Sequence, residues 1–288
     1  MKQRDVDHLS GIETTGHEWD GIKELNNPLP RWWLWTFYAC IAFALVYSVL
    51  FPAWPLITGA TPGLLGYTTR GQFHREVAAA QADQAANLAR IAALPVAAIA
   101  ADPALAAFAS AGGASAFKVY CSQCHGSGAA GGFGYPNLND DDWIWGGSID
   151  QIYQTITHGA RSPGDDNTHN TIMPNFGTDG ILTRDQIRSV ASFVGSLSGL
   201  PGGTKTEEGE QIFAQNCAAC HGPDAKGITA MGAPDLTNAI WLYDGSVDGI
   251  VAQINHPRLG IMPAWGAKLG DTTVKELAVY VHGLGGGQ

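Results

Sequence analysis

The chain has 288 residues, of which 45% are hydrophobic and 15% charged, so it is long enough for two modest folded domains and is not intrinsically disordered. Its formal net charge is −10, and no run of Lys or Arg is long enough to follow a phosphate backbone. Composition therefore excludes nucleic acid as a partner and favours a basic protein or a cationic surface.

A long stretch between Arg31 and Arg70 carries no charged side chain. A helix over its first half, residues 32–51, spans roughly 30 Å, the thickness of the hydrocarbon core of a bilayer. Tryptophans gather at one end and Trp54 follows the other, as in the aromatic belts of membrane proteins. We predict an uncleaved transmembrane helix at residues 32–54, rather than a core helix or a signal peptide, whose apolar region is shorter and nearer the start.

Residues 55–112 are expected to form a linker and an Ala-rich helical tether. A stretch rich in Pro and Gly comes first, and the segment QFHREVAAAQADQAANLARIAAL after it suits a helix because alanine has the highest helix propensity. Gly112 and Gly113 then mark the expected start of the next domain.

The rest of the chain is an internal repeat. The sequence CSQCHG at residues 121–126 returns as CAACHG at residues 217–222. Further matched residues are Gly113, Phe117, Pro136, Trp143, Gly147, His158 and Met173 in the first copy, and Gly209, Phe213, Pro234, Trp241, Gly245, His256 and Met262 in the second. The offset falls from 98 at the histidines (256 − 158) to 89 at the methionines (262 − 173), because the first copy has a longer polar loop at 161–170. We predict two domains, at residues 113–199 and 204–285, separated at Gly202 and Gly203.

Each copy is predicted to be a small helical domain, so the fold class is all-α. One helix leads into the cysteines, a middle helix follows at 148–158 or 246–255, and an amphipathic helix closes the copy. The closing helices are expected to begin at the capping signals Thr183 and Asp271. No segment alternates polar and apolar residues convincingly enough to predict a strand.

Four of the five cysteines lie in the two C-x-x-C-H motifs, the pattern of covalent c-type haem attachment. This spacing puts both sulfurs on one side of a helical turn, where they can bond the two vinyl groups of a porphyrin while the adjacent histidine reaches the iron. We predict two covalently bound haem c groups, one held by Cys121, Cys124 and His125 and the other by Cys217, Cys220 and His221.

Three other uses of these cysteines are less favoured. Paired zinc knuckles are normally about 15–20 residues apart, far closer than Cys124 and Cys217. A thioredoxin-like pair requires a βαβ setting. A disulfide is geometrically possible, but it does not explain a second identical motif with matching flanks.

Each iron needs a sixth ligand, and the repeated loops IMPNFG at 172–177 and IMPAWG at 261–266 supply a candidate methionine in each copy. The proline after each methionine stiffens the loop that presents the thioether. We predict Met173 as the ligand opposite His125 and Met262 as the ligand opposite His221. The remaining candidates are the aligned pair His158 and His256, followed by His169, His282 and Met231, of which Met231 has no counterpart and is expected only to pack.

A His/Met ligand pair raises the haem potential and leaves no open iron site, so we expect electron transfer and no catalytic residue in this chain. The carbonyls of Pro136 and Pro234 are expected to accept the imidazole N–H groups of the two ligand histidines. Candidate partners of the haem propionates are Trp143, Trp241, Arg161 and Arg258. Haem is attached by this chemistry in the bacterial periplasm, which predicts periplasmic haem domains and a cytoplasmic tail at residues 1–31 in the inner membrane.

The tail GHEWDGIKELNNPLPRWW at residues 16–33, followed by one membrane helix and two class I cytochrome c domains, resembles subunit III, the dihaem P subunit, of cbb3-type cytochrome c oxidases. The resemblance implies that electrons pass from a donor cytochrome c through these haems to the monohaem subunit. They then reach the haem–copper centre of the catalytic subunit, where oxygen becomes water with proton translocation. The alternatives are a free-standing dihaem electron shuttle and the cytochrome subunit of a periplasmic dehydrogenase.

Overall fold

The structure, a computed structural model, describes residues 5–287. The chain divides into two compact units, residues 1–83 and 84–288, each of which is described by itself. Most of the described residues that form regular structure are helical, which confirms the predicted class.

The first unit begins with a hairpin of β1 (Thr14–Trp19) and β2 (Ile22–Leu25). This hairpin was not predicted. Its signal is Asp20 followed by Gly21, which both adopt positive φ (48° and 85°), as the favoured two-residue hairpin turn requires.

The apolar helix α1 (Arg31–Leu50) follows, and it confirms the predicted membrane-length helix, although the helical part ends before residue 54. None of its residues is buried. After it, the short pair β3 (Pro55–Leu56) and β4 (Gly59–Ala60) turns the chain back, so that Leu64 and Leu65 donate to the carbonyls of Val49 and Leu50. These bonds satisfy carbonyls at the end of α1 that have no partner within the helix.

The Ala-rich segment forms α2 (Thr69–Ala93), α3 (Val96–Ala101) and α4 (Pro103–Tyr120). It is helical as predicted, but the part from Ile91 onward is not a free tether, because its apolar side chains are buried in a core. Gly112 and Gly113 lie inside α4 rather than at a boundary.

The remaining elements of the second unit are α5 (Ser122–His125), α6 (Ile149–His158), α7 (Arg184–Leu197), α8 (Glu207–Asn216), α9 (Ala218–His221), the 3-10 helix η1 (Thr229–Met231), α10 (Val247–Asn255), α11 (Gly266–Leu269) and α12 (Asp271–His282). The middle helices α6 and α10 begin at the expected serines, Ser148 and Ser246. Thr183 caps α7 as predicted, and Gln186 completes the capping box. The prediction for Asp271 is wrong: Gly270 precedes α12 without a side-chain cap, and Asp271 bonds Lys275 and Tyr153 instead.

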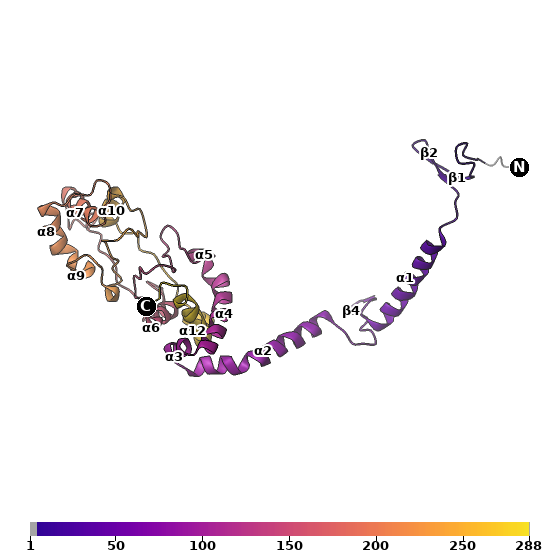
Figure 1. The fold of residues 1–288 in the computed structure, drawn as a ribbon, viewed down its shortest axis with the longest axis horizontal. Coiled ribbons are helices and arrows are strands. Elements are labelled where there is room, and N and C mark those ends of the chain that lie inside the picture. Colours follow the sequence, from indigo (N-terminus) through magenta and orange to yellow (C-terminus); the bar gives the residue numbers. More distant parts are fainter. Residues whose placement is uncertain (1–4, 288) are drawn as a thin grey trace. The chain divides into compact units, whose positions relative to one another are not determined.

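The closing helices of the two copies are exchanged. A first core is formed by buried side chains of α3, α4, α6 and α12, and a second core by those of α7, α8 and α10. Figure 1 shows the same grouping, with α12 beside α4 and α6, and α7 beside α8 and α10. The closing helix of each copy therefore packs on the opening and middle helices of the other copy.

The glycine and phenylalanine that precede each C-x-x-C-H motif explain how the helices fit. A Cβ added to Gly113 would lie 2.2 Å from the carbonyl oxygen of Glu276 on α12, and one added to Gly209 would lie 2.6 Å from that of Ser189 on α7. One turn further along, Phe117 packs on Tyr280 and Phe213 packs on Phe193. The same close crossing is thus made twice, each time between different copies.

The connection between α7 and α8 keeps these two helices together. Leu200 donates to Gly195 and Thr204 donates to Ser192, so the chain reverses within a few residues. Gly203 approaches the backbone of Gly195 so closely that a Cβ would meet it at 2.4 Å. The glycines expected to separate two domains lie in this tight turn, which joins two helices of the second core.

Candidate functional site

The two C-x-x-C-H motifs have the same local structure. The first cysteine of each ends the helix before it and begins a single turn of helix, with φ and ψ of −109° and −33° at Cys121 and −115° and −34° at Cys217. The histidine N–H bonds back to the carbonyl of that first cysteine in both motifs. The glycine that follows has φ of 79° in both, a conformation that favours glycine.

Each motif lines a largely apolar cavity. The first, of about 380 Å³, is lined by Cys121, Cys124 and His125, and the methionine in its wall is Met262. The second, of about 460 Å³, is lined by Cys217, Cys220 and His221, and it holds Met173. The predicted pairing of Met173 with His125 and of Met262 with His221 is therefore wrong. Each methionine loop lies just before a closing helix in the chain, and it packs with that helix against the other copy.

Backbone hydrogen bonds fix each methionine loop in this place. Met262 and Ala160 exchange two N–H···O bonds of 2.9 and 3.0 Å, and Trp265 donates to Ile156 at the end of α6. In the second core, the residues after Met173 bond α10, with Gly177 and Thr178 both donating to Asn255.

The two motif histidines favour the neutral form, and each has one ring nitrogen in a hydrogen bond. Nδ1 of His125 donates to the carbonyl of Pro136 at 3.0 Å, and Nδ1 of His221 donates to that of Pro234 at 3.1 Å, as expected from the sequence. Burial lowers the pKa of both imidazoles, an effect that these carbonyls partly oppose. Nε2 is therefore the nitrogen left to bind a metal, in an uncharged ring.

The sulfur environment suits a thioether better than a thiolate. Burial raises the pKa of Cys121 and of Cys217 to about 11, and the neighbouring Cys124 or Cys220 adds to the effect. Thiolate ligands for zinc would need the opposite shift.

One buried group in the second cavity has no protein partner. Nε1 of Trp241 is buried and makes no hydrogen bond among the described residues, although Trp241 lines the cavity. A haem propionate would accept this hydrogen bond, so the residues present fit the group. Trp143, its counterpart in the first copy, donates to Gly286 instead.

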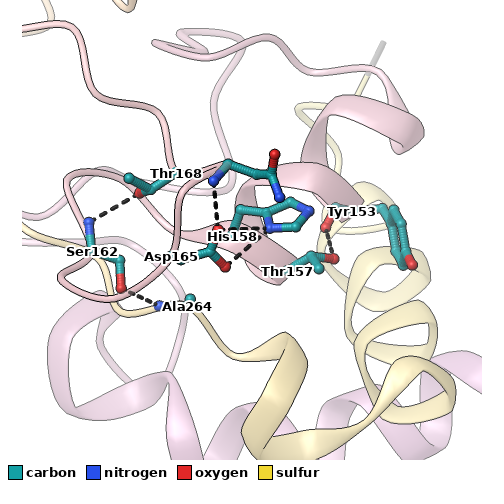
Figure 2. Close-up of polar contacts among 8 residues, drawn as sticks. Tyr153, Thr157, His158, Ser162, Asp165, Thr168 and Ala264 are labelled. Atoms are coloured by element: carbon teal, nitrogen blue, oxygen red, sulfur yellow. Dashed lines mark hydrogen bonds and ion pairs between the residues drawn. The ribbon is translucent and has the colours of Figure 1, made fainter.

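The other candidate ligands have different surroundings. His158 and His256 are absent from the described linings of both cavities, and Nδ1 of His158 lies 3.0 Å from an oxygen of Asp165 (Figure 2). His169 stacks on Trp145. Met231 does line the second cavity, a position that sequence comparison with the first copy gave no reason to expect.

Comparison with known proteins assigns the chain to a family. The profile for the N-terminal domain of cytochrome oxidase-cbb3, FixP, matches residues 11–58. The profile for cytochrome c oxidase, cbb3-type, subunit III, matches residues 109–194 and 204–281. This chain belongs to the family of cbb3-type cytochrome c oxidase subunit III.

Full-length relatives carry the same description. The FixP subunit of a cbb3-type cytochrome c oxidase from Sinorhizobium medicae is 56% identical over all of this chain and 99% of its own length. The corresponding FixP of Rhizobium meliloti is 54% identical over the same shares, and CcoP of Cereibacter sphaeroides is 50% identical over 96% of this chain and 95% of its own. As a member of subunit III, the chain is the electron-transferring cytochrome subunit of a cbb3 oxidase, is anchored to a membrane, and assembles with other oxidase subunits. The free-standing shuttle and the dehydrogenase subunit are therefore set aside.

Proposed function

We propose that this subunit carries two covalent haem c groups and passes electrons through them toward the oxidase core. The supporting observation is that each cavity brings one C-x-x-C-H motif together with one methionine of the repeated IMP loops. When bound, each haem supplies a one-electron iron couple that needs no substrate site.

The proposed attachment is through Cys121 and Cys124 for the first haem and through Cys217 and Cys220 for the second. The axial pairs are His125 with Met262 and His221 with Met173. Pro136 and Pro234 orient the histidines, since their carbonyls hold Nδ1. This pairing differs from one within each copy, and the backbone bonds of the methionine loops support it.

The two cavities share a wall, which supports electron passage between the haems. Residues that line both include Tyr135, Pro136, Asp142, Ile144, Arg161 and Tyr243. With a shared wall of side chains, two haems bound in these cavities would lie next to each other with no intervening domain linker.

The wider path follows from the family. We infer that a donor cytochrome c reduces this subunit, which then reduces a monohaem cytochrome subunit and, through it, the haem–copper subunit. We further infer a bacterial inner-membrane location with residues 1–31 in the cytoplasm and the haem-binding unit in the periplasm, where haem c is attached.

Removing one haem tests the axial pairing. In the full chain, the double change Cys121→Ala and Cys124→Ala leaves only the haem of His221. Adding Met173→Ala to this background should abolish the methionine-to-ferric-haem absorption band and lower the potential, while adding Met262→Ala should leave both unchanged.

The reciprocal background, with Cys217→Ala and Cys220→Ala, reverses the expectation. A band that depends on Met262 in the first background would establish pairing within each copy and contradict the exchange. In the first background, a band that survives both Met173→Ala and Met262→Ala would show that neither methionine binds the haem of His221, and it would point to Met231.

A further inference from the structure

Arg161 occupies a position that serves both haem sites. It is the first residue of the loop 161–170 that lengthens the first copy, and it lines both cavities. Its side chain is half-buried, and burial lowers its pKa. Among residues 5–287 no ion pair with a carboxylate involves it, and its guanidinium donates to backbone carbonyls instead.

The guanidinium joins equivalent points of the two methionine loops. Its Nε donates to the carbonyl of Gly260 at 2.7 Å, and its Nη1 donates to the carbonyl of Thr171 at 3.2 Å. These carbonyls are 89 residues apart (260 − 171), the same offset that separates the two methionines, and each lies two residues before its methionine. One planar fork therefore holds the start of both loops, which a single point donor does less well.

The backbone of Arg161 has an uncommon conformation that its neighbours hold in place. Its φ is +52°, an uncommon conformation for a residue with a long side chain. The conformation is fixed by a 2.7 Å bond from its N–H to His169, and by Ala160 before it, which pairs with Met262. The guanidinium also lies over the ring of Trp145, 5.9 Å from the centroid. A strained residue that its neighbours hold in place is a feature of functional sites.

The neighbouring Ser162 gives a matched contrast. Its Oγ accepts the N–H of Ala264 at 2.9 Å (Figure 2), so it supports the loop of Met262. Its other hydrogen bond goes from its N–H to Thr168, and among the described residues neither bond reaches the loop of Met173. Ser162 thus serves one haem site, whereas Arg161 serves two.

We propose that Arg161 is a positioning residue shared by both haems: it holds the two methionine-bearing segments in register, and its positive charge raises the potential of both irons. The proposal rests on the proposed axial role of Met173 and Met262. The charge acts in this direction because reduction removes one positive charge from the haem, so that a nearby cation favours the reduced state.

The test compares Arg161→Gln, Arg161→Lys and Ser162→Ala in the full chain with both haems attached. The readouts are the two methionine–ferric-haem bands and the two midpoint potentials. In Arg161→Gln both bands should weaken and both potentials should fall, by about a tenfold shift in each oxidised-to-reduced ratio, which is about 59 mV for a one-electron couple. Arg161→Lys should keep both potentials closer to the parent because it keeps the charge. Ser162→Ala should affect only the haem of His125.

A change at only one haem in Arg161→Gln, or at neither, overturns the proposal. If Arg161→Gln does not retain both haems, Arg161→Lys decides the test. Lysine keeps the charge but not the planar fork, so methionine bands like those of the parent at both haems would then overturn the proposal. The variants Met173→Ala and Met262→Ala separate this result from the ligand assignment. If each removes one band while Arg161→Gln removes none, the axial ligands stand and the shared role of Arg161 is wrong.

Discussion

Replacing Gly113 by alanine tests the close crossing of α4 and α12, the contact that commits the last helix to the first core. The added Cβ would lie 2.2 Å from the carbonyl oxygen of Glu276 and 2.7 Å from Cβ of Tyr280, against about 3.4 Å for ordinary contact. The two helices would have to separate by about 1.2 Å (3.4 − 2.2), because neither obstacle can rotate away.

The expected loss of stability is the difference of two effects. Overpacking a core costs up to about 3 kcal/mol, and alanine in place of a helical glycine returns about 1 kcal/mol. We therefore expect Gly113→Ala to lower the free energy of unfolding by about 2 kcal/mol, which is roughly 4–8 °C in midpoint for a unit of this size. Thermal unfolding of the haem-loaded chain, followed by far-ultraviolet circular dichroism and haem absorption, measures it.

Gly112→Ala is the matched control. Its Cβ would meet Oε1 of Glu276 at 2.6 Å, the movable end of a side chain, so this variant should be at least as stable as the parent. The disturbance in Gly113→Ala should also appear in the band of the haem that Met262 serves. Equal stability of the two variants would refute the argument, and a disturbance confined to the Met173 haem would refute the assignment of α12 to the first core.

Three further predictions concern single side chains of the second unit. Burial raises the pKa of Glu276, so its contribution to stability is complete below its ordinary value of 4.5 and is lost as the pH rises through the folded pKa. Glu276→Gln should then raise the unfolding midpoint above neutral pH and not in acid, and a pH-independent effect would contradict this. Lys275 is buried and donates to the carbonyls of Ile91 and Ala92, so Lys275→Met should cost about 1–3 kcal/mol in urea unfolding, whereas Lys205→Met on the surface should cost little. Thr183→Ala removes the cap of α7 and should cost about 1 kcal/mol, with Thr183→Ser close to the parent; equal losses would assign the effect to the lost methyl group.

Local chemistry made much of the site predictable. The C-x-x-C-H motifs predict the haem-binding segments because two thioethers and an adjacent histidine need that spacing on one helical turn. Pro136 and Pro234 could be matched to the two histidines because each follows its C-x-x-C-H motif at an equivalent place in the repeat. Asp20 followed by Gly21 is also a hairpin-turn signal, although the residues on either side of it do not alternate polar and apolar side chains as a half-buried strand does.

Residue spacing could not decide which methionine meets which histidine. Met173 lies 48 residues after His125 and 48 residues before His221 (173 − 125 = 221 − 173), so it is equally near both along the chain. The tether prediction failed for a related reason. Alanine-rich segments have the same propensity whether free or packed, and only the presence of α12 shows that Ile91 and its successors are buried.

The sequence by itself determined the membrane-length helix, two C-x-x-C-H motifs, two methionine loops and the helices that carry them. Each of these depends on residues close together in the chain. Only the tertiary structure decided how the copies share their helices. Both opening helices present the same glycine and phenylalanine, so either closing helix can cross either of them. The tight turn between α7 and α8 makes the choice, because it keeps α7 in the second core and leaves α12, with Met262 before it, to complete the first.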